Sequence, residues 1–348
     1  MKNKNVLITG GSGYFGEILC KKLINKNYNC TILDINPPDY NFLGNNVNYI
    51  NCDIRDTSLV MDSLKNINYV FHNVAQVPLS KNKKLFHDVN YLGTKNILEA
   101  SLENSIDHFA YTSSSAIFGV PDKNPINETT IPIPGEEYGK AKLDGEKIVE
   151  EFSKLGLKTS IIRPRTILGG GRLGIFQILF EWIYQNQNIP VFDNGNNIYQ
   201  FVHADDLAEA IIKTTKIPKS EIFNIGAEKY CSMRETLQYL IDSVNSKSKI
   251  KSFKSKHIVP FMNLASKLGI SPLAGYHSLM YGKSLYFDIK KSQNELDWTP
   301  KYSNKEMIVE SYNYYIKNRE KILNGNSNLS HHKTGVKQGI LKLINFFI

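Results

Sequence analysis

Cysteine is scarce in this sequence, with four residues in a chain of 348. Cys20, Cys30, Cys52 and Cys231 lie far apart, form no Cys-x-x-Cys pair and have no histidine at ligand spacing. A disulfide framework, a zinc site and an iron–sulfur site are therefore not expected. The sequence predicts four reduced structural thiols and no metal site.

Long hydrophobic runs are also missing. No stretch approaches the roughly 18 apolar residues that a membrane-spanning helix needs. The apolar run at residues 6–8 is followed at once by glycines, which is not the pattern of a signal peptide. Neither a repeat of solenoid period nor a nucleic-acid-binding motif is present. These absences predict a cytoplasmic protein that does not bind DNA or RNA.

Positive charge is what the sequence has in excess. Lys+Arg number 42 against 33 for Asp+Glu, which gives a net charge of +9, and 41% of the residues are hydrophobic. Such a composition predicts a globular core. The charge leaves open an anionic substrate, a membrane surface or scattered surface lysines. Lysines 247, 249 and 251 alternate as on one face of a strand, and we expect a solvated edge strand there.

The first half alternates short β-branched runs with helical patterns. Strands are expected at 5–9, 30–33, 47–50, 69–73, 109–112 and 159–162, and helices at 14–24, 57–64, 89–102 and 138–155. Buried strands separated by helices are typical of a parallel sheet covered on both faces. The predicted fold class is α/β, a Rossmann doubly wound parallel sheet with a smaller mixed C-terminal lobe.

The pattern loosens after residue 163. Helices are expected at 175–185, 206–214 and 232–244, and strands at 191–192, 200–202 and 222–225, with longer connections. We predict a Rossmann domain at 1–165 and a substrate lobe at 166–320, some of whose strands and helices return to the Rossmann sheet. A flexible linker and an amphipathic tail are expected at 321–348.

Glycines cluster between the first expected strand and the first expected helix, at Gly10, Gly11, Gly13 and Gly16. Glycines in this position let the backbone turn tightly and approach a pyrophosphate at the helix N-terminus. Asp34 ends the second strand about twenty residues later, where its carboxylate would accept hydrogen bonds from ribose hydroxyls and repel a 2′-phosphate. The segment therefore predicts a dinucleotide site that prefers NAD to NADP.

The spacing Thr-Gly-Gly-x-Gly-x-x-Gly at 9–16 resembles that of the extended short-chain dehydrogenase/reductase family, which includes NAD-dependent sugar epimerases. Further segments match in order: 53–56 resembles the family's adenine-contacting motif, 72–75 the loop after the fourth strand, and 90–96 the helix with a central asparagine. The resemblance covers about residues 5–320. The cofactor-binding residues that it implies are Gly10, Gly13, Tyr14, Phe15, Gly16, Asp34, Asp53, Ile54, Val74, Ala75, Asn90, Tyr138, Lys142 and Arg163.

Tyr138 and Lys142 stand four residues apart, a spacing that places both side chains on one face of a helix. The ordinary tyrosine pKa of about 10 is too high for a base at neutral pH. A lysine cation and a positive nicotinamide ring both favour the phenolate, so the pair suits proton transfer. Three serines at 113–115 end an expected strand, at the edge where open α/β sheets bind ligands.

The resemblance implies hydride transfer between a secondary hydroxyl and NAD. Tyr138 would take the hydroxyl proton and Lys142 would hold the nicotinamide ribose. Ser115 matches the family's catalytic serine and would hydrogen-bond the reacting oxygen, whereas Ser113 and Ser114 are expected to satisfy the backbone. The family's dehydratases carry Asp-Glu where this chain has Ala116 and Ile117, which disfavours dehydration. A homodimer through the helices that carry Asn90 and Tyr138 is also implied.

The substrate lobe departs from the family pattern. Sugar-nucleotide epimerases carry an arginine at the position of Tyr199 to hold the diphosphate, and a second arginine expected before residues 287–288 is also missing. Arginines that flank the glycines at 169–171 could serve instead. We expect the substrate site to include Gln76, Ser115, Arg165, Arg172 and Tyr199.

Three functions stay open at this point. The favoured function is oxidation, reduction or epimerisation of a secondary hydroxyl on a nucleotide sugar. The segments at 163–164 and 201–203 also resemble 3β-hydroxysteroid dehydrogenases, so the alternative substrate is a lipid-like alcohol. A catalytically silent NAD-sensing module is the third reading, which the set of Ser115, Tyr138 and Lys142 disfavours.

The last residues, 336–348, place apolar side chains on one helical face and Gln338, Lys342 and Asn345 on the other. This segment is too short to span a membrane but suits the interface of a bilayer. Docking on the protein body or on a partner subunit explains the pattern equally well. We therefore expect either a peripheral contact with the inner face of the membrane or a protein contact.

Overall fold

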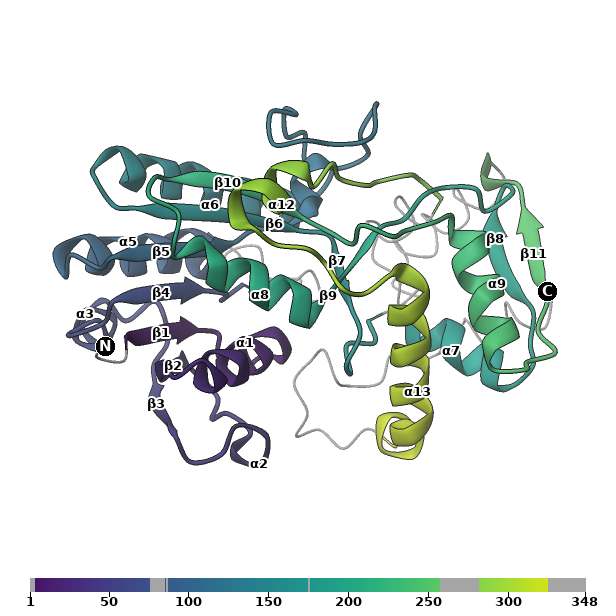
Figure 1. Cartoon of the computed structure of the whole chain (residues 1–348), viewed down its shortest axis with the longest axis horizontal. Coiled ribbons are helices and arrows are strands. Elements are labelled where there is room, and N and C mark those ends of the chain that lie inside the picture. The colour runs from purple at the N-terminus through teal and green to yellow at the C-terminus, as the bar shows by residue number, and fades with distance from the viewer. Residues whose placement is uncertain (1–3, 76–84, 86, 175, 257–281, 325–348) are drawn as a thin grey trace.

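Seven parallel strands form the central sheet, in the order β10-β6-β5-β4-β1-β2-β3 (Figure 1). The computed structural model describes residues 4–75, 85, 87–174, 176–256 and 282–324. The predicted doubly wound parallel sheet is confirmed, and each predicted strand of the first half lies within two residues of an observed one. The strands of this sheet are β1 (Asn5–Thr9), β2 (Asn29–Asp34), β3 (Val47–Asn51), β4 (Tyr69–His72), β5 (His108–Thr112), β6 (Thr159–Pro164) and β10 (Glu221–Ile225).

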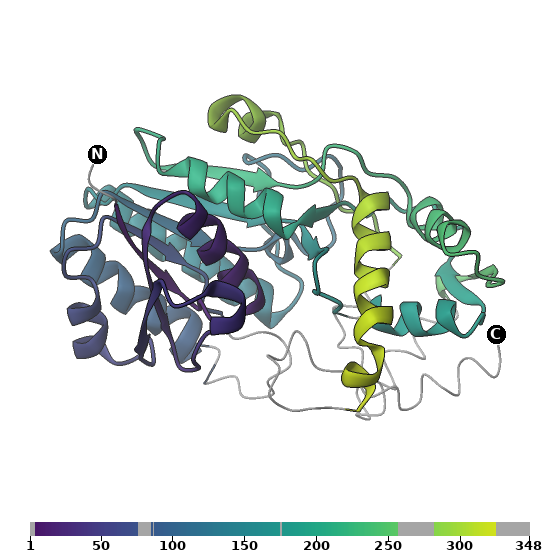
Figure 2. The same cartoon turned by 60° about the horizontal axis from the view of Figure 1, so that its bottom comes forward.

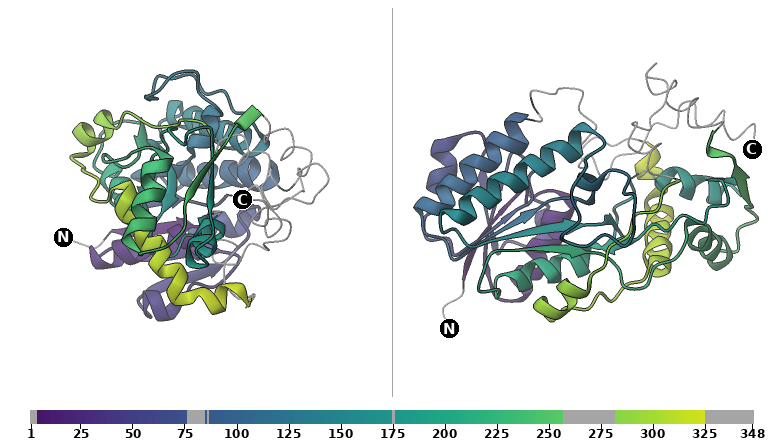
Figure 3. Two further views of the ribbon diagram at one scale, coloured as in Figure 1. Left: turned by 90° about the vertical axis from the view of Figure 1, so that its right-hand side faces the viewer. Right: turned by 90° about the horizontal axis from the view of Figure 1, so that it is seen from above.

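Helices cover both faces of this sheet (Figure 3). Successive side chains of a strand point to opposite faces, and Val6, Leu7 and Ile8 of β1 are all fully buried. Val6 and Ile8 pack in one cluster with α1 (Tyr14–Asn25) and α8 (Ala204–Thr214). Leu7 packs on the other face with α3 (Thr57–Ser63), α5 (Thr94–Glu103) and α6 (Glu137–Lys154). The continuous apolar strands predicted from the sequence are thus buried on both sides.

The prediction of an α-helix at 89–102 is wrong for its first residues. The structure begins it with a π-helical turn, Asp88–Gly93, and only then continues as α5. A π-helical turn is wider than an α-helical one and is often found at functional sites. Asn90 lies in this turn and is buried.

The second lobe has its own core of side chains from α7 (Phe176–Tyr184), β8 (Ile189–Phe192), α9 (Met233–Ser243) and α13 (Asn304–Leu323). Figure 2 shows α13 between the central sheet and the rest of this lobe. A small parallel pair, β7 (Thr166–Leu168) and β9 (Phe201–His203), follows directly from β6 and leads into α8. Three further short helical elements are α2 (Tyr40–Leu43), α12 (Lys290–Leu296) and a 3₁₀ turn at Ser115–Phe118.

The lysine-rich strand forms at the edge of the second lobe. β11 (Ile250–Phe253) pairs in parallel with β8 in a two-stranded sheet. Lys247, Lys249 and Lys251 are exposed, as predicted for a solvated edge, although only Lys251 lies within the strand.

Gln76 and residues 325–348, which include the predicted linker and the tail at 336–348, lie outside the described residues. The first part of the predicted linker segment, residues 321–323, is the end of α13. Among the described helices, none is long and apolar enough to cross a bilayer. The thiols of Cys20, Cys30 and Cys52 are buried, and that of Cys231 is partly buried.

Candidate functional site

The candidate site lies at the carboxyl ends of β1, β2, β4, β5 and β6, where the sequence predicted it. The glycine loop comes first, between β1 and α1. Gly10 has a φ of +66°, a conformation that other residues rarely adopt, and its N–H donates to the Leu33 carbonyl at 3.0 Å. A Cβ at Gly16 would lie 2.2 Å from the Gly10 oxygen. The first turn of α1 can therefore pack against the loop only because residue 16 is glycine.

The N-terminus of α1 has no side-chain cap, since its N-cap residue is Gly13. By contrast, α3, α6, α8, α9 and α13 each begin with a side chain that accepts a backbone hydrogen bond. Uncapped N–H groups and the positive end of the helix dipole favour a phosphate. Tyr14 and Phe15 are buried below this turn, and the Tyr14 hydroxyl donates to the Gly169 carbonyl at 2.5 Å.

Asp34 ends β2 beside the glycine loop. Its carboxylate accepts from the Ser12 N–H at 3.2 Å and from the Asn36 N–H at 3.1 Å, and burial raises its pKa. These bonds hold the carboxylate at the edge of the loop, where it can accept from ribose hydroxyls. The bare helix end, the close-packed glycines and this carboxylate fit a dinucleotide.

The predicted cofactor-binding residues at 53–54 and 74–75 follow strands β3 and β4 at the same edge of the sheet. The Asp53 carboxylate is paired with Arg55 at 2.6 Å, and the Arg55 hydrogen bond holds the pKa of Asp53 below its usual range. Ile54 is buried next to it, whereas Val74 and Ala75 are partly exposed in the segment after β4.

His72 is a structural residue that the sequence argument left without a role. It is fully buried, and its ring nitrogens contact the Thr9 hydroxyl at 2.7 Å and the Thr94 hydroxyl at 3.0 Å. Burial, helped by the charge of Lys142, lowers the His72 pKa to about 3, so the ring is neutral. Thr94 also donates to the Asn90 carbonyl at 2.8 Å. The neutral ring thus connects β1 to the π-helical turn that carries Asn90.

Tyr138 and Lys142 lie on α6, as predicted. Glu136 caps this helix by accepting from the N–H groups of Tyr138 and Gly139, each at 2.9 Å. Lys142 is only 2% exposed, and its ammonium donates to the Thr112 carbonyl at 2.8 Å. Burial lowers the Lys142 pKa to about 7, against the opposing effect of Glu146. The Thr112 carbonyl and the Glu146 carboxylate both stabilise the charged form of this buried lysine.

Burial raises the pKa of the Tyr138 phenol, whereas a hydrogen bond with Ser114 and the charge of Arg172 act in the lowering direction. The three serines after β5 have different partners. Ser113 donates to Glu146 at 2.5 Å, Ser114 caps the Ala116 N–H at 3.1 Å, and Ser115 accepts from Arg165 at 2.7 Å. The sequence resemblance implies the catalytic role for Ser115, and the contact between Ser114 and Tyr138 is seen only in the structure. Three identical residues in a row give no signal that separates them.

Arg163 points into the protein. Its guanidinium binds the carboxylate of Glu146 through two nitrogens, with contacts of 3.0 and 2.6 Å, and both side chains are almost fully buried. This ion pair connects β6 to α6, and it therefore helps to fix the helix that carries Tyr138 and Lys142. Glu146 was also missed, although its position four residues after Lys142 places it on the same face of the helix.

The predicted substrate residues meet where the two lobes join. The Arg165 guanidinium lies 4.9 Å from the centre of the Tyr199 ring, and the Tyr199 hydroxyl contacts that of Thr166 at 2.9 Å. Arg172 lies 5.9 Å from the centre of the Tyr14 ring. Burial lowers the Arg172 pKa, and the neighbouring Tyr138 and Tyr14 oppose this. The structure therefore brings Ser115, Arg165 and Tyr199 together and places Arg172 beside Tyr138.

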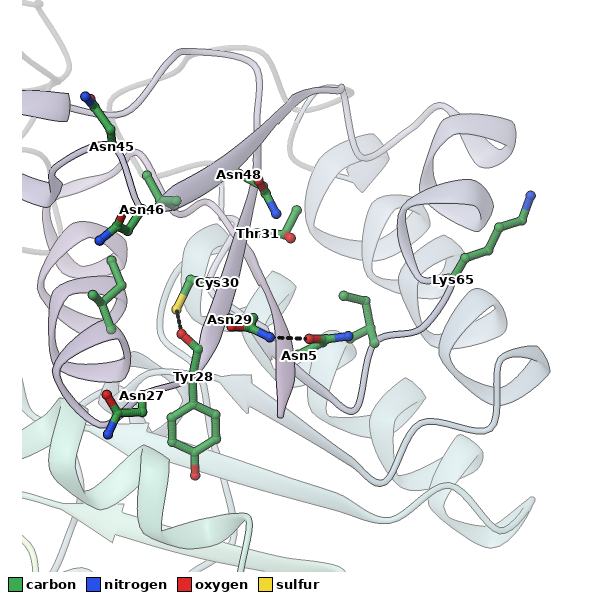
Figure 4. A pocket seen from close by; sticks show the side chains of 13 residues that line it. Asn5, Asn27, Tyr28, Asn29, Cys30, Thr31, Asn45, Asn46, Asn48 and Lys65 are labelled. Carbon is green, nitrogen blue, oxygen red and sulfur yellow. Dashed lines mark hydrogen bonds between the residues drawn. The ribbon is translucent and has the colours of Figure 1, made fainter. Parts of the chain in front are cut away.

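A hollow of about 660 Å³ lies at the opposite end of the strands (Figure 4). It is lined by asparagines around the start of β1, β2 and β3, and the Asn29 side chain donates to that of Asn5 at 2.9 Å. Tyr28 and Lys65 also line it, but they come from separate elements and point away from each other (Figure 4). Among the described residues, no cluster of histidine, cysteine and carboxylate side chains could hold a metal ion. The carboxyl edge is therefore the stronger candidate.

Comparison with known proteins identifies the family of this chain. The family model described as "NAD dependent epimerase/dehydratase family" matches residues 6–226. An uncharacterised protein of Sinorhizobium fredii is 47% identical over 99% of this chain and 86% of its own length. A putative UDP-glucose 4-epimerase of Methanocaldococcus jannaschii is 30% identical over 90% of this chain and 99% of its own length.

Two further matches bear on the substrate and the fold. The human sterol-4-alpha-carboxylate 3-dehydrogenase is 29% identical over 60% of this chain and 57% of its own length. The UDP-glucose 4-epimerase of Thermotoga maritima, solved with UDP-glucose, has a TM-score of 0.74 and 24% identity, covering 90% of this chain and 99% of its own. This last likeness shows a common fold.

Proposed function

The chain belongs to the NAD dependent epimerase/dehydratase family, and from this premise we propose that it is a 4-epimerase of a nucleotide sugar. It is an NAD-dependent enzyme with a small-molecule substrate. The observation that carries the proposal is the arrangement of Tyr138, Lys142 and two serine hydroxyls beside the bare N-terminus of α1. That arrangement joins a proton-transfer unit to a dinucleotide site.

The residues present fit NAD, which supplies a hydride acceptor when bound. The glycine loop and the first turn of α1 would hold the pyrophosphate, and the Asp34 carboxylate the adenosine ribose. Lys142 would hold the nicotinamide ribose and favour the phenolate of Tyr138. Tyr138 then takes the proton of the sugar hydroxyl at its phenol oxygen. Ser114 orients that phenol, and Ser115 donates to an oxygen of the substrate.

Relatives support a nucleotide sugar over a sterol. The putative UDP-glucose 4-epimerase of M. jannaschii matches 90% of this chain, whereas the human sterol dehydrogenase matches 60% of it. The arginines missing from the usual diphosphate positions are the observation that keeps the sterol alternative open. The silent NAD-sensing module is disfavoured because the proton-transfer residues are all present.

Incubation with UDP-glucose, UDP-N-acetylglucosamine and UDP-glucuronic acid tests the proposal directly. We expect conversion of at least one of them to its 4-epimer, followed by proton NMR, without net formation of NADH. A 3β-hydroxysterol serves as the comparison, with NADH absorbance as the readout. Sterol oxidation with no change in any UDP-sugar would contradict the proposal.

We also propose, on family resemblance, that the protein forms a homodimer through the helices that carry Asn90 and Tyr138. The cytoplasmic location and the contact of residues 336–348 with a membrane likewise stay predictions.

A further inference from the structure

Arg165 is a buried arginine at the junction of the two lobes. It follows β6, and its backbone N–H donates to the Ile225 carbonyl of β10 at 2.9 Å. Its side chain is 1% exposed, and the guanidinium carbon lies 4.9 Å from the centre of the Tyr199 ring and 5.8 Å from that of Phe287. A guanidinium held between two aromatic rings has little freedom to turn away.

The contact between Arg165 and Ser115 has a fixed direction. Arg165 Nη1 lies 2.7 Å from Ser115 Oγ, and both side chains are buried. A guanidinium has donors and no acceptor, whereas a hydroxyl has one donor and two acceptor lone pairs. Ser115 must therefore accept this bond, and its own proton stays available for another oxygen.

The neighbouring serines show that this arrangement is particular to Ser115. Ser113 donates its proton to Glu146, and Ser114 accepts from the Ala116 N–H and contacts Tyr138. Of the three, only Ser115 is paired with a cation, and this cation, Arg165, packs against Tyr199 at the junction of the lobes. A hydroxyl that accepts from a cation is a stronger donor toward its next partner.

We propose that Arg165 is a positioning residue, which fixes the Ser115 hydroxyl as a hydrogen-bond donor to an oxygen of the substrate. This inference rests on the proposed function for its substrate. In this proposal Arg165 orients the Ser115 hydroxyl, whereas the sequence predicted that Arg165 contacts the substrate directly. A bond aimed in advance costs no reorganisation during the reaction, so its loss lowers turnover more than binding.

The test compares Arg165→Met, Arg165→Lys, Ser115→Ala and the double variant Arg165→Met/Ser115→Ala, each with NAD bound. For the UDP-sugar that the wild type converts, we expect Arg165→Met to lower kcat about 10–100-fold with KM changed less than about threefold. Arg165→Lys keeps the positive charge and a donor nitrogen, so it should retain more activity than Arg165→Met. The kcat of the double variant should match that of Ser115→Ala within about twofold, because both substitutions remove the same hydrogen bond to the substrate.

Losses that multiply in the double variant would overturn the proposal, and so would an Arg165→Met enzyme within twofold of the wild type. A second measurement needs neither a variant nor a substrate. In a neutron structure of the perdeuterated wild-type protein with NAD, we expect the Ser115 deuteron to point to no protein acceptor. A deuteron donated to a protein oxygen would overturn the inference. This result stands even if no UDP-sugar is converted, which would count against the proposed function alone.

Discussion

Ser113, Ser114 and Ser115 are adjacent in the sequence and bind three different partners. Ser113 donates to the buried carboxylate of Glu146, Ser114 contacts the phenol of Tyr138, and Ser115 accepts from Arg165. The chain leaves β5 in an extended conformation at Ser114, with φ −160° and ψ 151°. Successive side chains of an extended backbone point in opposite directions, which separates neighbours that the sequence cannot tell apart.

The pH dependence of turnover should distinguish Ser114 from Ser115. The hydrogen bond from Ser114 acts to lower the Tyr138 pKa, so Ser114→Ala should raise that pKa. Less phenolate is then present at a given pH, and the rising limb of kcat should move to higher pH by about 0.5–1 unit. Ser115→Ala is the matched control, which should lower the plateau of kcat and leave the limb in place. If the rising limb moved equally in Ser114→Ala and Ser115→Ala, the separate roles of the two serines would be contradicted.

At the scale of elements, the site depends on how α1 meets the glycine loop. The loop is anchored by the bond from the Gly10 N–H to the Leu33 carbonyl, and Gly16 lies directly against it. The helix begins without a side-chain cap, so its first N–H groups need another partner. Gly16 therefore permits the close packing, and Gly13 leaves the helix end without a side-chain cap.

Gly16→Ala should destabilise the protein and weaken NAD binding together. A Cβ at this position would lie 2.6 Å from the Gly11 Cα, so the helix must move away from the loop. Overpacking of this kind costs about 1–3 kcal/mol. Thermal unfolding should show a Tm lower by several degrees, and calorimetry a loss of NAD affinity.

Gly13→Ala is the matched control for stability. Its added Cβ would lie 3.3 Å from the Gly10 oxygen, at a φ of −77° that alanine adopts freely. Its Tm should stay near that of the wild type. A Gly16→Ala protein as stable as Gly13→Ala would show that the close approach is not required.

At the scale of the whole molecule, the sequence predicted the doubly wound sheet because buried strands and glycine turns are local patterns. It also placed Tyr138 and Lys142 correctly, since their relation lies within one helix. It could not predict the π-helical turn around Asn90, nor the bond between Arg163 and Glu146, because these depend on contacts between separate elements. The sequence could not identify the partner of Arg165 either, because Ser115 lies 50 residues away in the chain.

Positive charge lies both inside this molecule and on its surface. Arg165 is buried at the junction of the lobes, and exposed lysines lie near β11. Cofactor binding and proton transfer are assigned to different residues, so the two roles can be measured separately. We propose that the pyrophosphate and the adenosine ribose of NAD are held at the α1 end of the sheet, whereas proton transfer takes place at α6 and the serines after β5.

Tyr138→Phe tests this division most directly, because it removes one hydroxyl and leaves the dinucleotide end unchanged. Calorimetric titration with NAD and NMR measurement of UDP-sugar turnover should be made on the same preparations. We predict NAD affinity within about threefold of the wild type and turnover lower by about 100–10,000-fold. Turnover close to that of the wild type would contradict the assignment of Tyr138 as the group that takes the substrate proton.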